Sequence, residues 1–372
     1  MTNREVQLDA VRGLAIVLAM GWHLNNGADT SAFMDVLLFP GRSFGWAGVD
    51  LFFVLSGFLV GRLVLSEIQL SDAFDYRRFL VRRGFRLWPV LYVYLAAQLI
   101  VADDPWQSYF FQVFLHVQNY AETPLAHLWS LAVEEHFYLA LGILMPLLIR
   151  WRASARTLAF SVIGLMATAW ALRSAGLAVG VDPHDLQVQT QYRVDALGMG
   201  LLIAIAAVHF PVLFERLKQQ RLILAAAGIL GFALLTVLGD GISRVLVGYT
   251  VAYLASAALI LSVDKVHVPR AVKPIVRALA FLGLYSYSLY IWHNGLGNVV
   301  AAKVASVLGI TWPDAVVVMK YGASIVGAVV VSKLIEMPMI NLRDRLFPSA
   351  RSKTAREASI DEAGGTPRAE TA

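Results

Sequence analysis

Long apolar segments separated by short basic loops constrain this chain more than any other feature. Ten stretches come close to the length of about 17–25 residues that an α-helix needs to cross a bilayer. They cover residues 8–25, 46–66, 86–103, 128–149, 157–176, 194–211, 222–239, 245–263, 278–296 and 315–337. Of the 372 residues, 58% are hydrophobic and only 15% are charged, against about a quarter charged in soluble proteins. We therefore predict an all-α polytopic membrane helix bundle of about ten transmembrane helices.

The basic residues predict how the bundle is oriented. With these spans, 22 of the 31 Lys and Arg residues fall on the side of the N-terminus and 5 on the opposite side. Because cytoplasmic loops carry the excess of basic residues, we expect both termini in the cytoplasm. Residues 1–345 form one transmembrane domain in this interpretation, and 346–372 form a disordered cytoplasmic tail. The apolar stretch 108–119 is too short to span and is expected to be interfacial or re-entrant.

Several kinds of chemistry are excluded or lack their sequence patterns. The chain has no cysteine, which excludes disulfides, thiolate nucleophiles and Cys-based metal sites. It also contains no HExxH zinc motif and no P-loop. We expect no metal site. The first apolar segment resembles a signal-peptide core, but its internal Arg12 and the lack of a small-residue cleavage site favour a retained helix.

Arg12 and His23 lie in the same apolar segment, eleven positions apart. Eleven residues make about three helical turns, so both side chains point the same way, roughly 16 Å apart along the axis. Ionisable residues inside a membrane span are functional candidates by default. The alternative is an interhelical ion pair with a His that reaches toward the interface. We favour a reaction path along this face of the helix.

With the predicted topology, the intramembrane polar residues separate by depth. The outer half holds mainly histidines and carboxylates, which suit proton transfer: His23, Asp50, His127, Glu134, Glu135, Asp195 and His293, with Arg193 among them. The inner half holds mainly guanidinium and ammonium groups, which suit phosphate: Arg12, Arg62, Arg82, Arg83, Arg86 and Lys333, with Glu336 among them. This division predicts a donor site inside and a proton-transfer site outside.

The segment 127–139 carries two adjacent acids at membrane depth. By helical period, His127, Glu134 and Tyr138 share a face, and Glu135 points about a quarter-turn away. We expect Glu134 to line the reaction cavity. We expect Glu135 to tie its helix to another through Arg193 or Arg12. The alternative for both acids is a purely structural network.

Two further segments carry candidate residues. In 79–89, Arg82 and Arg86 share a helical face with Arg78, and Arg83 lies beside it. This cluster could clamp the phosphates of a nucleotide-bearing donor, or it could only mark an inner loop. In 45–63, the small residues allow close helix packing, whereas Asp50 is an acid at the predicted depth of His23.

Together these segments resemble the acyltransferase 3 family of bacterial membrane proteins. The matching segments, in order, are LDAVRGLAIVLAMGWH, GWAGVDLFFVLSGFL, RRGFRLWP, HLWSLAVEEHFYL, RVDALGMG, YSYSLYIWH and IEMP. The resemblance implies about ten helices and acyl transfer from cytoplasmic acyl-CoA, commonly acetyl-CoA, to glycan hydroxyls or small molecules. It implies that Arg12 and His23 are essential and that Arg83 and Arg86 hold the donor. Glu134, Glu135 and Glu336 match its acidic positions.

The sequence departs from the family pattern in two respects. His136 stands where the family usually has Gln after the paired Glu. No hydrolase-like domain follows the last predicted helix, which favours the branch of the family with a single domain.

We therefore expect an O-acyltransferase of the bacterial cytoplasmic membrane. It would use acyl-CoA as co-substrate, with no permanently bound cofactor. The acceptor would be a glycan or small-molecule hydroxyl, and we expect contact with the lipid bilayer but not with nucleic acid. The alternative is a proton-coupled transporter or flippase. No internal repeat pairs the two halves of the chain, which counts against that alternative.

Each candidate residue has an expected role. His23 is the general base or a transient acyl carrier, assisted by Arg12, and Asp50 or one of the paired glutamates orients it. The donor-binding residues are Arg82, Arg83 and Arg86. The substrate-binding residues are His127, Glu135, Tyr138, Arg193, His293 and Glu336.

Overall fold

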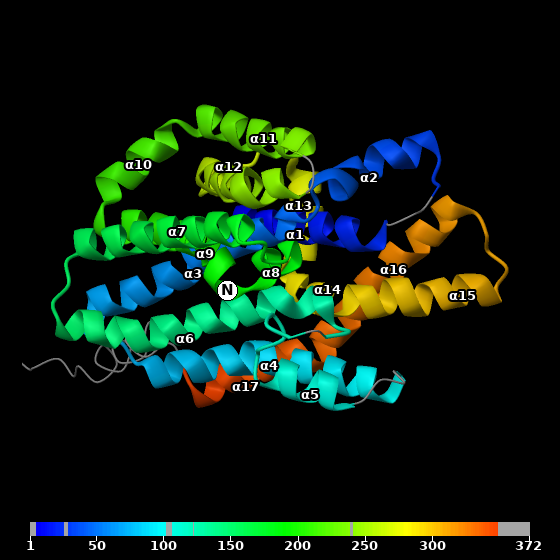
Figure 1. The fold of residues 1–372 in the computed structure, drawn as a ribbon, viewed down its shortest axis with the longest axis horizontal. Helices are drawn as coiled ribbons and strands as arrows, with labels where there is room; N and C mark the ends of the chain where they lie inside the picture. The colour runs from blue at the N-terminus through cyan, green and yellow to red at the C-terminus, as the bar shows by residue number, and fades with distance from the viewer. Residues whose placement is uncertain (1–4, 26–28, 102–105, 122, 239–240, 349–372) are drawn as a thin grey trace, which may run out of the picture.

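The computed structural model describes residues 5–25, 29–101, 106–121, 123–238 and 241–348, and these residues contain helices and no strand (Figure 1). The predicted all-α class is confirmed. The α-helices are α1 Val6–Leu24, α2 Ala32–Phe44, α3 Ala47–Ser71, α4 Tyr76–Val101, α5 Trp106–Phe114, α6 Trp129–Arg150, α7 Ala155–Ala178, α8 Pro183–Val188, α9 Thr190–His209, α10 Pro211–Gln219, α11 Arg221–Leu238, α12 Tyr249–Val263, α13 Lys273–Leu284, α14 Ser286–His293, α15 Ala302–Val307, α16 Pro313–Val331 and α17 Met337–Leu346. A 3₁₀ turn, Ala126–Leu128, precedes α6, and π-helical segments cover Arg244–Gly248, Asn294–Ala301 and Ser332–Glu336. The predicted tail lies outside the described residues from 349 onward.

Seven helical segments in the described part of the chain are long and apolar enough to cross a membrane. They are Ala47–Ser71, Ala126–Arg150, Ala155–Ala178, Pro183–His209, Arg221–Leu238, Arg244–Val263 and Pro313–Leu346. An eighth span results if Lys273–Leu284 and Ser286–Val307, which meet at a bend of 66°, are counted as one. The chain is therefore a membrane-type helical protein.

Two of the ten predicted spans, 8–25 and 86–103, correspond to α1 and α4, which are not among these seven. Both are long enough, at 19 and 26 residues. α1 carries Asp9 and Arg12, and the first half of α4 carries five arginines. The number ten therefore stays a prediction, as does the side of the membrane on which the termini lie.

Glycines let the central helices approach closely. A Cβ on Gly57 of α3 would lie 2.1 Å from the carbonyl oxygen of Leu197 in α9. A Cβ on Gly200 of α9 would lie 2.1 Å from the carbonyl oxygen of Val54 in α3. The α3–α9 pair is therefore in backbone contact, as small residues allow in membrane bundles.

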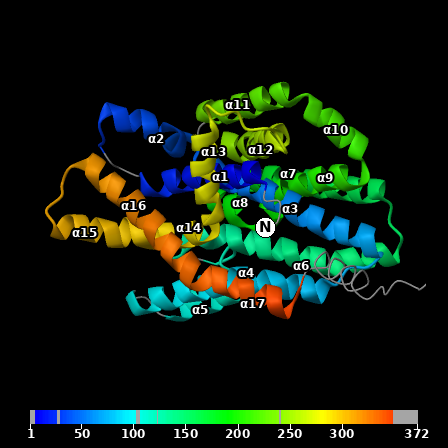
Figure 2. The ribbon, with the colours of Figure 1, turned by 180° about the vertical axis from the view of Figure 1, so that it is seen from behind.

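Helix α13 runs across α1 rather than along it (Figure 2). The crossing is equally tight, because a Cβ on Gly13 would lie 1.8 Å from the carbonyl oxygen of Leu279. The chain then turns by 66° into α14. After this break α14 packs against α1 and α4, and Tyr287 donates a hydrogen bond to the backbone carbonyl of Leu87.

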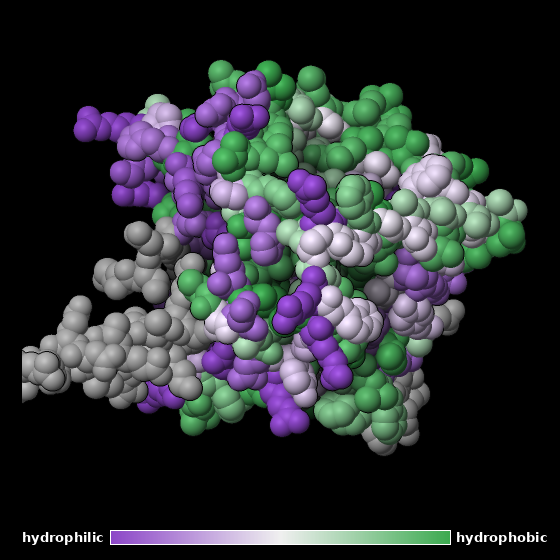
Figure 3. All heavy atoms as spheres, turned by 90° about the vertical axis from the view of Figure 1, so that its left-hand side faces the viewer, coloured by the Kyte–Doolittle hydropathy of each residue, from purple (hydrophilic) through white to green (hydrophobic). Residues whose placement is uncertain are grey.

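The outer helices expose apolar side chains, as expected where lipid is the solvent. Ile223 and Leu230 on α11 are 66% and 67% exposed, and Phe160 on α7 is 71% exposed. Hydrophilic side chains instead gather over the end of the bundle where α6 joins α7 and α9 joins α10 (Figures 1 and 3). Helix α5 has nine residues, too few to cross a bilayer, as predicted for 108–119.

Candidate active site

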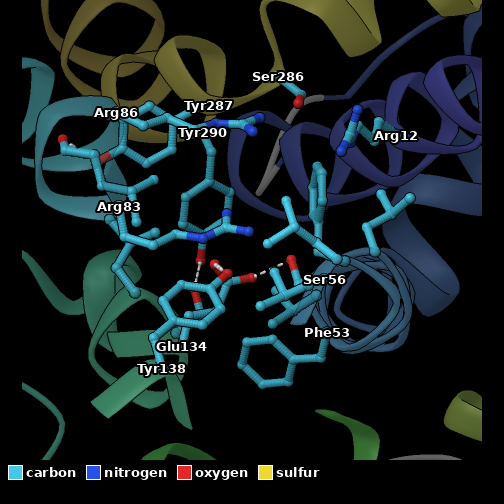
Figure 4. A pocket seen from close by; sticks show the side chains of 18 residues that line it. Arg12, Phe53, Ser56, Arg83, Arg86, Glu134, Tyr138, Ser286, Tyr287 and Tyr290 are labelled. Carbon is cyan, nitrogen blue, oxygen red and sulfur yellow. Dashed lines mark hydrogen bonds between the residues drawn. The ribbon is translucent and has the colours of Figure 1, made fainter. Parts of the chain in front are cut away.

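A cavity of about 300 Å³ lies between α1, α3, α4, α6 and α14 (Figure 4). Its lining combines apolar side chains with polar groups that converge on the cavity, as in many ligand pockets. The polar lining residues are Arg12, Ser56, Arg83, Arg86, Ser130, Glu134, Tyr138, Ser286, Tyr287 and Tyr290.

Three arginines make one part of the cavity strongly basic. Arg83 and Arg86 extend from α4 and Arg12 from α1, and their guanidinium groups converge on the same space (Figure 4). Nη1 of Arg12 lies 3.0 Å from Oδ1 of Asp9. The guanidinium of Arg83 lies over the ring of Tyr138, 4.9 Å from its centroid. No ion pair within the described residues neutralises Arg83 or Arg86, so this part of the cavity could hold an anionic group.

Glu134 is held in the cavity wall by two hydroxyl groups. Ser56 of α3 donates a hydrogen bond to Oε1 over 2.8 Å, and Tyr138 donates one to Oε2 over 3.0 Å. The two acceptor bonds fix both oxygens of the carboxylate and keep it facing the arginines (Figure 4). Tyr138 reaches Glu134 because positions four apart lie on one helical face.

Tyr290 lines the cavity and also contacts two histidines. Its hydroxyl lies 2.6 Å from Oγ of Ser130 and donates to the backbone carbonyl of His127 over 2.7 Å. Its ring centroid lies 5.9 Å from that of His293 and 6.5 Å from that of His127. Tyr290 therefore stands between the cavity and a group of histidines.

Three histidines from distant parts of the chain meet beyond Tyr290. Nδ1 of His23 lies 2.8 Å from Nε2 of His293, and the two rings stack with centroids 5.0 Å apart. His127 lies edge-on to both, at 6.3 Å from His23 and 5.5 Å from His293. His293 is fully buried, His127 is buried, and His23 is half-buried. His23 does not itself line the cavity, so the predicted continuous path from Arg12 to His23 is interrupted by Tyr290.

A basic cavity next to a histidine group, inside a membrane-type bundle, agrees with the sequence resemblance. The model of the acyltransferase 3 family, described as an acyltransferase domain, matches residues 5–337. The chain belongs to the acyltransferase 3 family.

Curated bacterial relatives match most of this acyltransferase 3 chain. The peptidoglycan O-acetyltransferase OatA of Listeria monocytogenes serovar 1/2a is 26% identical over 338 residues, 82% of this chain and 51% of the relative. The putative peptidoglycan O-acetyltransferase YrhL of Bacillus subtilis is 27% identical over 319 residues, 77% of this chain and 47% of the relative. The chain thus spans about half the length of the curated relatives it matches. No solved structure matches it significantly.

In this acyltransferase 3 protein, Asp50 and Arg193 are not part of the cavity. Oδ1 of Asp50 lies 2.8 Å from Nη2 of Arg193, and the guanidinium sits 3.7 Å from the ring centroid of Tyr249. Among the described residues, no hydrogen bond joins Asp50 to His23. The prediction that Asp50 orients the His23 ring is therefore wrong. The partner of His23 is His293.

The partners predicted for Glu135 are also wrong. Arg193 is bound to Asp50, and Arg12 is bound to Asp9. Glu135 is 7% exposed, does not line the cavity, and its Oε1 has no hydrogen-bond partner in the described part of the chain. The helical period separates the two glutamates as expected, but it does not identify the helix that Glu135 faces.

Two other candidates lie away from the cavity. Arg82 pairs with Asp344 over 3.0 Å and donates to the carbonyl of Phe347, so it ties α4 to α17 instead of facing the donor space. Glu336 is buried and accepts hydrogen bonds from Ser288 over 2.7 Å and Ser332 over 2.8 Å. Both residues join helices, because a charge near a packed helix surface is stabilised by the nearest partner.

Apart from that of Tyr138, the hydroxyl groups of the site were not predicted from the sequence. Ser56 was assigned to helix packing, and Ser130 and Tyr290 were not singled out. A small hydroxyl residue in an apolar span gives no signal of its own, because it fits both packing and hydrogen bonding. Tyr290 stands three positions before His293, close enough to share its helical face, and this spacing was the one available indication.

Proposed function

We propose that this protein is a membrane O-acyltransferase that moves an acyl group, most simply acetyl, from acyl-CoA to a hydroxyl of a glycan acceptor. One observation carries the proposal. Tyr290 lines the basic cavity that holds Arg12, Arg83 and Arg86. Its ring also contacts His293, which is hydrogen-bonded to His23. An anionic donor needs the basic cavity, and a base-catalysed transfer needs the histidine pair.

The arginines would bind the phosphates of coenzyme A. Guanidinium groups bind phosphate oxygens in a bidentate geometry, and Arg83 and Arg86 have no competing carboxylate partner among the described residues. Arg12 and His23 stand about 16 Å apart along α1, a separation comparable to an extended pantetheine arm. Tyr290 stands between the cavity and the histidines. The thioester would therefore reach His23 when the hydrogen bond between Ser130 and Tyr290 breaks. We expect the donor to enter from the cytoplasm, where acyl-CoA is found. The basic end of the cavity would then face the cytoplasm.

The proposed chemistry is a balanced transfer. His23 takes the proton of the acceptor hydroxyl, and the hydroxyl oxygen forms a bond to the thioester carbonyl carbon. The carbon–sulfur bond then breaks, and the proton passes from His23 to the leaving thiolate. The products are an ester on the acceptor and free coenzyme A. A route through an acyl-His23 intermediate would use the same groups in two steps.

The acceptor class is proposed from the relatives. The names of two of them specify peptidoglycan O-acetyltransfer. A glycan hydroxyl would approach His23 from the face of the bundle opposite the basic end, in a bacterial cytoplasmic membrane.

The test uses full-length protein in proteoliposomes with acetyl-CoA and a soluble peptidoglycan fragment. Release of coenzyme A is followed with a thiol reagent, to which the protein contributes no background because the chain has no cysteine. Acetyl-ester on the fragment is measured by mass spectrometry. We expect both products from the wild type and neither from His23→Ala, whereas His136→Ala, a control histidine bonded to Thr190 over 2.7 Å, retains activity.

Two results would contradict the proposal. One is a His23→Ala variant that transfers acetyl groups at the wild-type rate. The other is movement of the fragment across the membrane, driven by a pH gradient without consumption of acetyl-CoA. The second result would favour a proton-coupled transporter.

A further inference from the structure

We propose that His293 is a positioning residue that fixes the ring of His23 in one tautomer, with the proton on Nδ1 and a bare Nε2 as the base. The inference rests on the proposed function, since it names what prepares the proposed base. It starts from the hydrogen bonds around the two rings.

The proton on His293 is assigned by its backbone neighbours. Nδ1 of His293 lies 2.8 Å from the carbonyl oxygen of Tyr290 and 3.1 Å from that of Leu289. A carbonyl oxygen can only accept a hydrogen bond, so Nδ1 of His293 must carry a hydrogen. In a neutral imidazole the other nitrogen, Nε2, is then an acceptor.

The position of the proton on His293 determines which nitrogen of His23 is protonated. Nε2 of His293 lies 2.8 Å from Nδ1 of His23, so Nδ1 of His23 is the donor in this bond. Neutral His23 is left with a lone pair on Nε2. A doubly protonated His293 is disfavoured, because its side chain is 0% exposed and it contacts two other histidines and no carboxylate among the described residues.

Neighbouring side chains hold the imidazole rings of His23 and His293 in this arrangement. His127 packs edge-on against both rings, and its Nε2 lies 3.2 Å from the carbonyl oxygen of Ile291, which fixes its own orientation. Asn298 donates to the backbone carbonyl of His23 over 3.0 Å, and Ser324 donates to that of His293 over 3.2 Å. Asn298 therefore ties the segment Asn294–Ala301 to α1 at His23, and Ser324 ties α16 to α14 at His293.

Nε2 of His23 remains available for a substrate. His23 is half-buried, and no described residue hydrogen-bonds to this nitrogen. A base held in position by a third group is the usual arrangement for general-base catalysis, although the orienting group is commonly a carboxylate. Here a neutral histidine supplies the orientation, which avoids the cost of burying another charge at this depth.

Three variants in proteoliposomes test the role of His293. His293→Leu removes the acceptor for Nδ1 of His23, whereas His293→Gln places an amide oxygen near the position of Nε2. With acetyl-CoA and the peptidoglycan fragment, we expect His293→Leu to lower kcat about a hundredfold, within the range of a lost general base, while the KM for acetyl-CoA is unchanged. His293→Gln should recover a large part of kcat, and His136→Gln should match the wild type. A loss of folded protein without a change in kcat, or no recovery with Gln, would overturn the positioning role.

A second measurement reads the tautomer without enzyme turnover. Protein labelled with ¹⁵N in its eight histidines is placed in lipid nanodiscs, and the His23 signals are assigned by their loss in His23→Ala. We expect protonated Nδ1 and unprotonated Nε2 in the wild type, and a mixture of tautomers in His293→Leu. A proton on Nε2 of His23 in the wild type would overturn the inference. Absence of acetyl transfer by the wild type would instead contradict the proposed function, while the spectrum would still report the tautomer.

Discussion

Oδ1 of Asp50 on α3 lies 2.8 Å from Nη2 of Arg193 on α9, and both side chains are almost completely buried. A second pair lies close by on the same helix, where Asp195 is 2.7 Å from Arg173 of α7. Each pair joins two helices that pack closely against each other. These charges therefore tie α3, α7 and α9 together, and none of the four side chains lines the candidate cavity.

Replacing one partner of the Asp50–Arg193 pair should destabilise the fold. Asp50→Leu leaves a buried guanidinium unpaired, and the expected loss is about 3–5 kcal/mol of unfolding free energy. Thermal unfolding in detergent measures the change. The double variant Asp50→Leu/Arg193→Leu should be more stable than either single variant, because no charge is left alone. A double variant as unstable as the sum of the two would show that the pair does not act as a unit.

Glycine at the α3–α9 contact should not tolerate a methyl group. Gly200→Ala would place a Cβ 2.1 Å from the carbonyl oxygen of Val54, so the helices must separate. We expect a loss of about 1–3 kcal/mol, typical of overpacking, or more. The control is Gly164→Ala on α7, where a Cβ meets nothing within 4 Å. Equal melting temperatures for the two variants would contradict the close contact of α3 and α9.

The cavity arginines should govern donor affinity. Arg83→Ala and Arg86→Ala each remove one charge-assisted contact to phosphate, worth roughly 1.5–3 kcal/mol, or about tenfold to a hundredfold in affinity for acetyl-CoA. Lys at either position should rescue poorly, since it lacks the planar fork. Arg82→Ala is the matched control, because Arg82 is bound to Asp344. Donor affinity is measured by equilibrium binding, and an equal effect of all three substitutions would contradict the assignment.

The two adjacent glutamates should differ in their effect on turnover. Glu134→Gln replaces a carboxylate that accepts from Ser56 and Tyr138, so those two bonds lose their charged acceptor. We expect lower kcat with normal amounts of folded protein. Glu135→Gln should leave both kcat and stability near the wild type, because no described cation loses an ion-pair partner. Steady-state kinetics and protein yield distinguish the two, and a greater loss of kcat in Glu135→Gln would reverse the assignment.

The sequence by itself determined the helical class, most of the apolar segments, and the arginines, histidines and Glu134 of the site. An apolar segment of about 17–25 residues in a bilayer forms a helix, because its backbone N–H and C=O groups must then form hydrogen bonds within the segment. The spacing of Arg12 and His23 on one helix, and of Glu134 and Tyr138 on another, follows from the helical period alone. These are relationships within single elements, where local geometry fixes which side chains lie together.

Only the tertiary structure decided which polar groups meet across helices. The predicted topology places Asp50 and His23 at one depth, but in the structure Asp50 faces Arg193 of α9. The pairing of His23 with His293, 270 residues away, depends on the break between α13 and α14 that brings α14 against α1. Such contacts depend on how whole helices pack, and packing is determined by shape complementarity along both surfaces, which no single segment contains.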